Sequence, residues 1–356
     1  MRAVMCAAQI PTAVPSVAAL TVEFPAQRHS QDEAITALAD WAGPEFLRFA
    51  ASSGVEARHL ALPMSRYTEL NGFTEANEAF IDVAIDLSER ALLSALDAAN
   101  MKPSDVDIVF STTVTGLAVP TLEARLATRV GLRPDFKRVP LFGLGCVAGA
   151  AGIARMYDYL VAYPNQVAAL LAVELCTLTV QREDRSIANL IATCLFGDGA
   201  AAVIATGAGR APVGPKVLAT RSRFYPDTDD VMGWNIGSFG FRIKLSAEVA
   251  TVAEKYLGED VRNFLADHGL TTADVATWVC HPGGPKVIDA VENVLELPAG
   301  ALDRTRNSLR DNGNLSSVSV LDVLRATMAD PPAAGSIGLM IAMGPGFCSE
   351  LVLLGW

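Results

Sequence analysis

The segment from Val139 to Leu160 reads VPLFGLGCVAGAAGIARMYDYL and decides the fold class of this chain. Its apolar start, Val139–Phe142, predicts a short strand, and Gly143-Leu-Gly145 predicts a tight turn. From Cys146 onward the residues are small and apolar, so a buried helix is expected to begin at the cysteine. A strand that turns at glycines into a helix is typical of layered α/β proteins.

Strands and helices alternate outward from this segment. In the first half of the chain we expect helices at 75–100 and 121–130, and apolar strands at Val106–Phe110, Val167–Val173 and Ala200–Ala205. In the second half we expect helices at 246–268, at 286–296 and ending near 328, and strands at Thr277–Cys280, Ile337–Met343 and Glu350–Leu354. Near-continuous apolar strands that alternate with helices predict a largely parallel sheet with both faces covered.

The order of these elements repeats within the chain. Ser104-Asp-Val106 precedes a strand in the first half, and Ala273-Asp-Val275 precedes its counterpart in the second. Each half ends with a Gly-X-Gly turn among apolar residues, in LFGDGAAAVIAT and in MIAMGPGFCSELVLL. Chance similarity between short apolar segments is the alternative. We predict two tandem α/β halves, 1–210 and 211–356, divided in the Gly- and Pro-rich segment 206–216.

The composition describes a globular chain of 356 residues, of which 51% are hydrophobic and 19% are charged. The net charge of −11 argues against nucleic acid or an anionic membrane surface as the main partner. No apolar run reaches the roughly 18 residues that indicate a membrane-spanning helix. Gln9, Pro11 and Pro15 interrupt the N-terminal segment, which we interpret as a lead-in and first strand, with a secretory signal as the lesser alternative.

The cysteines and histidines restrict the chemistry further. Six cysteines are scattered without a CxxC pair, which favours free thiols and a reducing, cytoplasmic location. Apart from the adjacent Cys280–His281, none of the four histidines stands at metal-ligand spacing from a second histidine or cysteine. No metal is therefore expected.

Cys146 is the most informative single residue. The positive end of a helix dipole stabilises a thiolate, so the pKa of a cysteine at a helix start is expected to be lowered. A nucleophile at the tip of a glycine-rich elbow suits covalent acyl transfer. A buried structural cysteine is the alternative.

Two polar residues of the second half complete a candidate site. His281 follows the strand at Thr277–Cys280, where α/β proteins place ligands, although an ordinary loop histidine is an equal alternative. Asn314 precedes a helix, where asparagine acts by default as a cap and otherwise as an amide donor to an oxyanion. Because the duplication places Cys146, His281 and Asn314 on corresponding loops, we expect a complete acyl-transfer set.

Five segments carry a family resemblance: GLGCVAGAAG, LFGDGAAAV, WVCHPGGPKVI, GNLSS and MGPGF. In this order they resemble the chalcone synthase-like, or type III polyketide synthase, family, and HPGG discriminates best. The resemblance implies a thiolase-like α/β fold, with duplicated α-β-α-β-α layers and two halves related by a pseudo-twofold axis. VTGLAVP, RVPLFGLGCVAGAAG and GLMIAMGPGFCSELVLL look closer still to actinobacterial enzymes that make alkylpyrones from long acyl-CoA starters.

The resemblance implies a role for each site residue. Cys146 takes the starter acyl group from CoA, and His281 forms an ion pair with its thiolate. Asn314, with His281, stabilises the enolate left when malonyl-CoA or methylmalonyl-CoA loses carbon dioxide. The acyl groups stay on CoA or cysteine, so no cofactor or metal is implied. Phe196 and Phe241 match two gatekeepers between the CoA tunnel and the cavity.

Further positions match the family through weaker patterns. Val119 matches the position at which one subunit reaches into its partner's cavity, so a homodimer is implied. Arg58 falls in the basic region that contacts CoA phosphates and is otherwise a surface charge. Trp234, where the chain departs most from the plant pattern, is expected to narrow or redirect the cavity. The positions that match the polyketide pocket are Val114, Thr115, Cys176, Thr179, Met232 and Ser316.

Two other functions fit the same residues. A ketoacyl synthase III-like enzyme would make a single condensation, but HPGG and the two gatekeeper phenylalanines argue against it. A catalytically silent subunit that binds acyl-CoA would not need an intact Cys, His and Asn.

Overall fold

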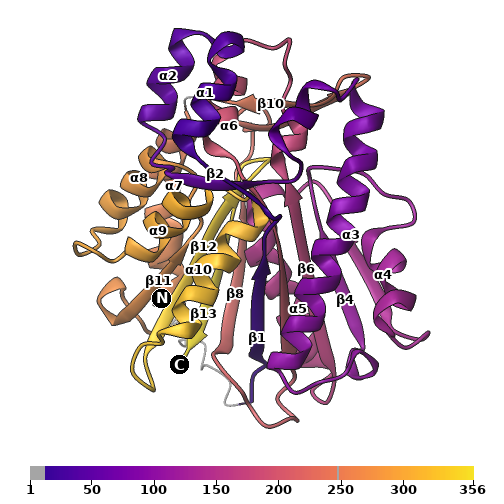
Figure 1. Cartoon of the computed structure of the whole chain (residues 1–356). Helices are drawn as coiled ribbons and strands as arrows, with labels where there is room; N and C mark the ends of the chain where they lie inside the picture. Colours follow the sequence, from indigo (N-terminus) through magenta and orange to yellow (C-terminus); the bar gives the residue numbers. More distant parts are fainter. Residues whose placement is uncertain (1–12, 247) are drawn as a thin grey trace.

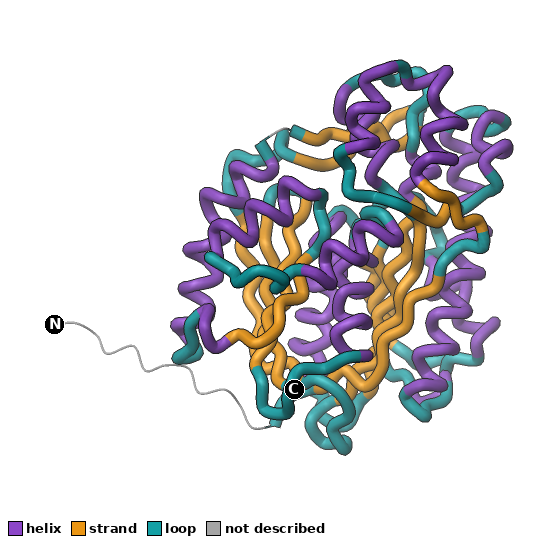
Figure 2. The backbone as a smooth tube through the Cα atoms, turned by 60° about the vertical axis from the view of Figure 1, so that its left-hand side comes forward, coloured by secondary structure: helices purple, strands orange, loops and turns teal. Residues whose placement is uncertain are grey.

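The computed structural model describes residues 13–246 and 248–356. The first twelve residues of the expected lead-in, including Cys6, lie outside this part of the chain. Strands run through the middle of the molecule, and helices lie on both sides of them (Figures 1 and 2). The N-terminal and C-terminal halves of the chain each contribute one set of strands.

The first half forms five strands in the order β5-β4-β6-β7-β1. β4 runs parallel to β5 and β6, whereas β7 is antiparallel to both β6 and β1. β6 and β7 are buried along their whole length, as expected for strands covered on both faces. The bounds are β1 (Ser16–Glu23), β4 (Ile108–Thr112), β5 (Lys137–Leu141), β6 (Val167–Leu175) and β7 (Asp198–Thr206).

The second half repeats this pattern in the order β11-β12-β13-β8. β11 is parallel to β12, and β13 is antiparallel to β12 and β8, so these strands correspond to β4, β6, β7 and β1. The predicted duplication is therefore confirmed. One residue pair, Ser16 with Lys216, joins the two sets into a nine-stranded sheet. The bounds are β8 (Lys216–Phe224), β11 (Val275–Cys280), β12 (Ile337–Gly344) and β13 (Cys348–Gly355).

Helices form three layers around the strands, which gives the predicted α-β-α-β-α order. α5 (Ala148–Ala162) and α10 (Ser317–Ala329) occupy the middle layer, where they pack on each other and on strands of both halves. α3 (Phe73–Ala98) and α4 (Leu122–Val130) cover the first set of strands. α7 (Val249–Asp267), α8 (Pro285–Leu295) and α9 (Asp303–Asn312) cover the second. The boundary predicted at 210 falls between β7 and β8, and the division into two domains remains a prediction.

The two central helices approach each other closely because α5 begins with small residues. A Cβ atom at Gly149 would lie only 2.2 Å from the backbone oxygen of Ser317 in α10. This distance is far below van der Waals contact, so a larger residue would push the helices apart. The close approach fixes the starts of the two helices relative to each other.

Small elements form a cap that the sequence analysis did not predict. Figure 1 shows α1, α2, α6 and β10 together at one end of the molecule, beyond the strands. These elements are short and many of their residues are partly exposed, so their apolar periodicity is weak. The bounds are α1 (Gln31–Ala42), α2 (Pro44–Ala51), α6 (Ile187–Leu195), β2 (Gln27–Ser30), β3 (Ala57–Leu60), β9 (Met232–Gly237) and β10 (Gly240–Leu245).

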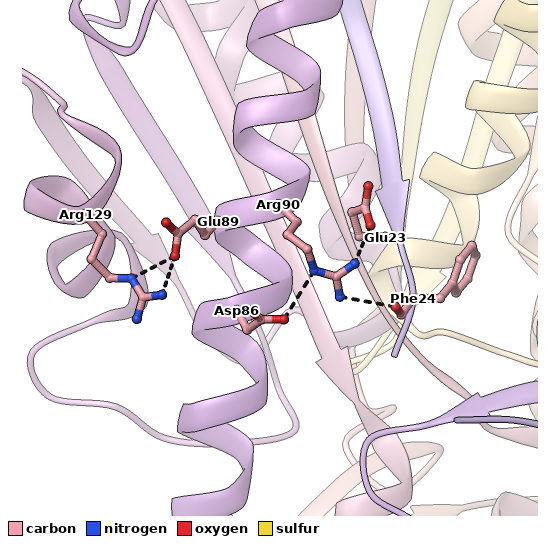
Figure 3. Close-up of polar contacts among 6 residues, drawn as sticks. All are labelled: Glu23, Phe24, Asp86, Glu89, Arg90 and Arg129. Atoms are coloured by element: carbon pink, nitrogen blue, oxygen red, sulfur yellow. Dashed lines mark hydrogen bonds and ion pairs between the residues drawn. The ribbon is translucent and has the colours of Figure 1, made fainter. Parts of the chain in front are cut away.

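Ion pairs connect α3 to its neighbours on the surface (Figure 3). Arg90 of α3 binds Glu23 of β1 at 2.7 Å and Asp86, one turn earlier, at 3.2 Å. Arg129 of α4 donates from Nε to Glu89 at 2.8 Å. Exposed pairs of this kind contribute about 0.2–1 kcal/mol each, so the buried apolar layers carry most of the stability. In the described ranges, no helix is both long and apolar enough to cross a membrane.

Candidate active site

Three loops bring Cys146, His281 and Asn314 to one cavity of about 530 Å³. Cys146 lies in a single 3₁₀ turn, Gly145–Val147, that leads into α5. His281 directly follows β11, and Asn314 lies shortly before α10. Because α5 and α10 are counterparts in the two halves, Cys146 and Asn314 occupy corresponding positions. The duplication thus assembles the site across the interface between the halves.

Glycines shape the elbow that presents Cys146. Gly145 has a φ of +55°, which is strained for residues with a side chain. A Cβ atom at Gly145 would also lie 2.6 Å from Cδ of Pro345, in the turn that joins β12 and β13. The GLGC and GPGF motifs therefore pack against each other, and their contact fixes the elbow.

The thiol of Cys146 meets the cavity, with its Sγ atom 3.7 Å from the hydroxyl oxygen of Ser316. Burial raises the pKa of Cys146 to about 12, and the buried carboxylate of Glu174 adds to the effect. The lowered pKa of Cys146 that its place at a helix start predicts is not found in this site. Loss of hydration outweighs the helix dipole, because dipole effects are modest and desolvation shifts reach several units. The thiol is protonated at neutral pH.

His281 is held by a hydrogen bond from its backbone N–H to the oxygen of Ile341, at 2.9 Å. Burial lowers the pKa of its imidazole to about 4, so His281 is neutral at pH 7. Its Nδ1 atom is buried without a hydrogen-bond partner among the described residues. These pKa shifts run against the ion pair with Cys146 that the family resemblance implies, and the ion pair stays a prediction. A neutral imidazole beside a neutral thiol is poised to accept a proton.

Asn314 is buried, and its backbone N–H and oxygen bond to Leu195 and Gly197 beside Phe196. Its side-chain oxygen accepts a hydrogen bond from the N–H of Ser316 at 2.8 Å. Ser316 stands before the first turn of α10, so the asparagine side chain does not cap that turn. The amide nitrogen makes only a long contact of 3.5 Å, to the oxygen of Gly283, and remains available as a donor.

The other residues expected from the sequence divide between two cavities. Thr179 is buried and lines neither, because its hydroxyl donates to the backbone oxygen of Cys176 at 2.7 Å. Val119 is 93% exposed on the surface. The residues that line the Cys146 cavity are Phe196, Val114, Cys176, Met232 and Ser316. Those that line a second cavity of about 670 Å³ are Thr115, Phe241 and Arg58.

Two of these placements bear on the roles predicted from the sequence. Phe241 lines the second cavity and meets the ring of Trp234, which lines the Cys146 cavity, so its role as a gate stays a prediction. Arg58 is only 3% exposed, and its guanidinium donates to the backbone oxygens of Thr193 and Phe196. A buried guanidinium bonded in this way holds the backbone beside Phe196 and does not form part of a surface site for CoA phosphates.

Two cations that the sequence analysis missed lie on the wall of the Cys146 cavity. Arg48 of α2 and Lys286 at the start of α8 are exposed and line this cavity. Lys286 belongs to the HPGGPK segment, and its position beside His281 could have been recognised. Arg48 carried no signal, because α2 itself was not predicted. On a chain of net charge −11, these cations offer a local site for anions.

Glu174 is a third residue that the sequence analysis missed. It lies in the apolar strand β6, is fully buried, and accepts hydrogen bonds from the N–H of Val114 at 3.1 Å and from the Ser317 hydroxyl at 2.6 Å. Burial raises its pKa to about 7. A lone glutamate in an otherwise apolar strand was the signal for it. Its carboxylate connects the first-half loop after β4 to the start of α10.

Comparison with known proteins agrees with this arrangement. Residues 216–355 match the family "Chalcone and stilbene synthases, C-terminal domain", and residues 51–214 match "FAE1/Type III polyketide synthase-like protein". A 1,3,6,8-tetrahydroxynaphthalene synthase of Streptomyces peucetius subsp. caesius is 52% identical, over 96% of this chain and 93% of that protein. A putative chalcone synthase of Bacillus subtilis (strain 168) is 35% identical, over 85% and 86%.

A solved structure shows the same fold. The crystal structure of 1,3,6,8-tetrahydroxynaphthalene synthase from Streptomyces coelicolor A3(2), a bacterial type III polyketide synthase, superposes with a TM-score of 0.91. The two sequences are 28% identical, and the match covers 97% of this chain and 99% of that one. Together with the duplicated fold and the cavity that holds Cys146, these similarities show that the chain belongs to the type III polyketide synthase family.

Proposed function

We propose that this enzyme condenses malonyl-CoA units into 1,3,6,8-tetrahydroxynaphthalene or a closely related aromatic polyketide. The observation that carries the proposal is the 52% identity to a synthase of that name over 96% of the chain. Enzymes of this family use CoA thioesters and need no additional cofactor. No comparison supports the long-chain alkylpyrone products that the sequence segments suggested.

The carbon balance identifies the starter for this product. Each malonyl unit loses one carbon as carbon dioxide and adds two carbons to the chain. A naphthalene ring system of ten carbons therefore needs five malonyl units, and the balanced reaction also releases five CoA, five carbon dioxide and one water. Malonyl-CoA serves as both starter and extender, and no long acyl-CoA is required.

The loading step follows from the neutral state of the site. The Cys146 sulfur attacks the thioester carbon, its proton passes to His281, and the released CoA thiolate takes that proton as it leaves. Proton transfer to a positioned imidazole activates a protonated thiol only when substrate is present. This arrangement explains how a buried thiol of raised pKa serves as the nucleophile.

The extension step uses Asn314. The next malonyl-CoA loses carbon dioxide, and the enolate oxygen accepts hydrogen bonds from the amide of Asn314 and from His281. The enolate carbon then attacks the acyl-cysteine, which restores the thiolate. The contact of the Asn314 oxygen with Ser316 supports this role, because it fixes which end of the amide can donate.

CoA itself is placed by the exposed cations. Arg48 and Lys286 line the Cys146 cavity and are accessible from solvent, so they suit the CoA phosphates better than buried Arg58. Phe196 lines the same cavity, and its backbone pairs with Asn314. Phe196 is therefore our candidate for the gate of this cavity.

This enzyme is also expected to form a homodimer, which is typical of the family. β5 is an edge strand with exposed side chains, and Val119 protrudes from the loop that precedes α4. Exposed edges and apolar residues of this kind mark surfaces that pair with another chain. The cytoplasmic location expected from the scattered cysteines remains a prediction.

The test is product analysis by mass spectrometry. We expect purified enzyme with malonyl-CoA alone to give tetrahydroxynaphthalene, with carbon dioxide and CoA released in equal amounts, and a Cys146→Ala variant to give none. Pyrones formed only when a long acyl-CoA is added would establish the alkylpyrone alternative. A β-ketoacyl product would indicate a single condensation, and failure of acyl-CoA to label Cys146 would indicate a silent subunit.

A further inference from the structure

The Cys146 cavity and the second cavity lie on opposite sides of a shared wall. Neighbouring residues in the chain line different cavities: Val114 lines the first and Thr115 the second, and Cys176 lines the first and Thr177 the second. The same alternation occurs in α6, where Thr193 lines the second cavity and Cys194 lines the first. At these places a single segment of chain lies between the two cavities.

At the β9–β10 hairpin, two aromatic rings lie between the cavities. Trp234 lines the Cys146 cavity, and its ring meets the edge of Phe241 with the centroids 5.9 Å apart. Phe241 lines the second cavity and meets Phe73 in the same way at 5.6 Å. At this point, side chains and not backbone separate the two spaces.

The hairpin depends little on the rest of the sheet. β9 and β10 pair only with each other, in a separate two-stranded sheet. Because the ring of Trp234 meets Phe241 between the two cavities, we expect truncation of the indole to leave a gap at this place.

The second cavity has an apolar part that could hold a hydrocarbon chain. This part includes Leu38, Leu60, Met64 and Leu70. Polar residues line the cavity as well, among them Asn71, Asn77, Gln181 and Glu183. Tyr67 and Thr177 are bonded to each other and, through Thr177, to buried Asp198, so they make no strong demand for a polar ligand.

We propose that Trp234 is a specificity-determining residue that separates the Cys146 cavity from a second, apolar chamber suited to the alkyl chain of a long acyl starter. With the indole in place, the enzyme accepts short starters such as malonyl. Without it, the two cavities join, and a long alkyl chain extends past Phe241 into the second chamber. The inference rests on the proposed polyketide synthase function and deepens it by naming what limits the starter.

The experiment compares wild type with Trp234→Ala on acetyl-, hexanoyl- and dodecanoyl-CoA, each with malonyl-CoA as extender. The readout is the ratio of kcat/KM for dodecanoyl-CoA to that for acetyl-CoA, with product masses. We expect this ratio to rise about ten-fold or more in the variant, because each methylene buried in the second chamber adds to binding.

Two control variants isolate the effect of the indole. Trp234→Phe keeps an aromatic ring against Phe241 and should keep the wild-type ratio. Ile236→Ala changes the same strand at a residue that is 51% exposed and lines neither cavity, and it should also keep that ratio. Circular dichroism and thermal unfolding check that each variant is folded.

The proposal is overturned if folded Trp234→Ala extends acetyl-CoA but its ratio of kcat/KM for dodecanoyl-CoA to that for acetyl-CoA does not rise. It is also overturned if wild type already has the same ratio as the variant. If the alanine variant does not fold, Trp234→Val carries the same prediction, because a β-branched residue suits a strand. Failure of the proposed function looks different, since wild type would then give no extended product from malonyl-CoA or any starter.

Discussion

The thiol of Cys146 and the imidazole of His281 line the same cavity, and loss of hydration favours the uncharged form of both groups. It raises the pKa of the thiol to about 12 and lowers that of the imidazole to about 4. Charge is therefore created only during the reaction, when the substrate and Asn314 can stabilise it. A site of this kind protects its nucleophile from oxidation and alkylation between turnovers.

Alkylation of Cys146 tests this picture. Because the thiol is protonated up to a pKa of about 12, we expect its reaction rate with iodoacetamide to rise throughout the range from pH 6 to 10 without reaching a plateau. The rate is measured by mass spectrometry of the peptide that contains Cys146, which separates it from the other cysteines. A plateau with a midpoint below the ordinary thiol value of about 8.5 would contradict the expectation.

Glu174 makes a second prediction at this scale. Burial raises its pKa from 4.5 to about 7, so its contribution to stability is fully present below pH 4.5 and is lost as the pH rises through about 7. Glu174→Gln cannot ionise, and its free energy of unfolding should change less than that of wild type between pH 4.5 and 7.5. Urea unfolding at a series of pH values measures this.

The charge of Glu174 also acts on Cys146. Its ionised carboxylate raises the pKa of the thiol, so the Gln variant should react faster with iodoacetamide than wild type at pH 8. Glu350→Gln is a matched control, because it also removes a buried carboxylate of raised pKa but does not contribute to the shift of Cys146. Equal rates for wild type and Glu174→Gln would mean that the carboxylate only holds the fold.

At the scale of elements, α5 and α10 position the site, because Cys146 and Asn314 stand immediately before them. The long amphipathic helices and the apolar strands were predicted from the sequence, since their periodicity reflects burial on a regular face. The elements of the cap were missed because they are short and partly exposed. One misassigned residue follows from this omission. Contact with CoA phosphates was expected for Arg58, and once α2 and β3 are known we propose it for Arg48 instead.

The pKa of Cys146 could not be predicted for a related reason. The sequence shows a helix start, which favours a thiolate, but it does not show how far the surrounding elements exclude water. Phe241 is a similar case, because its family pattern does not reveal that Trp234 stands between it and the cavity. Local patterns pointed to three residues that line one cavity and that we propose as the catalytic set, whereas the environment of each residue depended on contacts between distant segments.

The packing of α5 on α10 can be tested with two glycines of the same helix. Gly149→Ala places a Cβ atom 2.2 Å from the backbone oxygen of Ser317, so the start of α10, and Asn314 with it, must move. We expect destabilisation by about 1–3 kcal/mol and a fall in kcat of ten-fold or more. Thermal unfolding and initial rates with malonyl-CoA measure both effects.

Gly152→Ala is the matched control. Its Cβ atom would meet the methyl ends of Leu170 at 2.6 Å, and a flexible side-chain end can shift where a backbone oxygen cannot. Both variants gain the same helix propensity, about 1 kcal/mol for Gly→Ala. The difference between the two variants in stability and in kcat therefore reports the contact of Gly149 with α10. Equal values for the two variants would show that this contact does not set the activity.

At the scale of the whole molecule, the two edges of the nine-stranded sheet differ. β11 at one edge is almost entirely buried under helices, whereas β5 at the other is largely exposed. An uncovered edge strand is a template for pairing with another chain. The duplicated topology explains the asymmetry, because β5 is the one strand of the first half that has no counterpart in the second.

From this asymmetry we propose that the dimer interface lies at β5 and at Val119, and Val119→Asp tests this proposal. Val119 is 93% exposed in one subunit, so the substitution should leave the monomer's fold intact and oppose burial of the same position in a dimer. Sedimentation velocity should show a dimer for wild type and a shift toward monomer for the variant.

Val213→Asp changes another exposed valine, in the connection between β7 and β8, and should remain dimeric. If both variants stay dimeric, the subunits associate through another face. If Val119→Asp becomes monomeric and also loses the tetrahydroxynaphthalene product, the partner subunit's Val119 shapes the cavity, as the family resemblance implies.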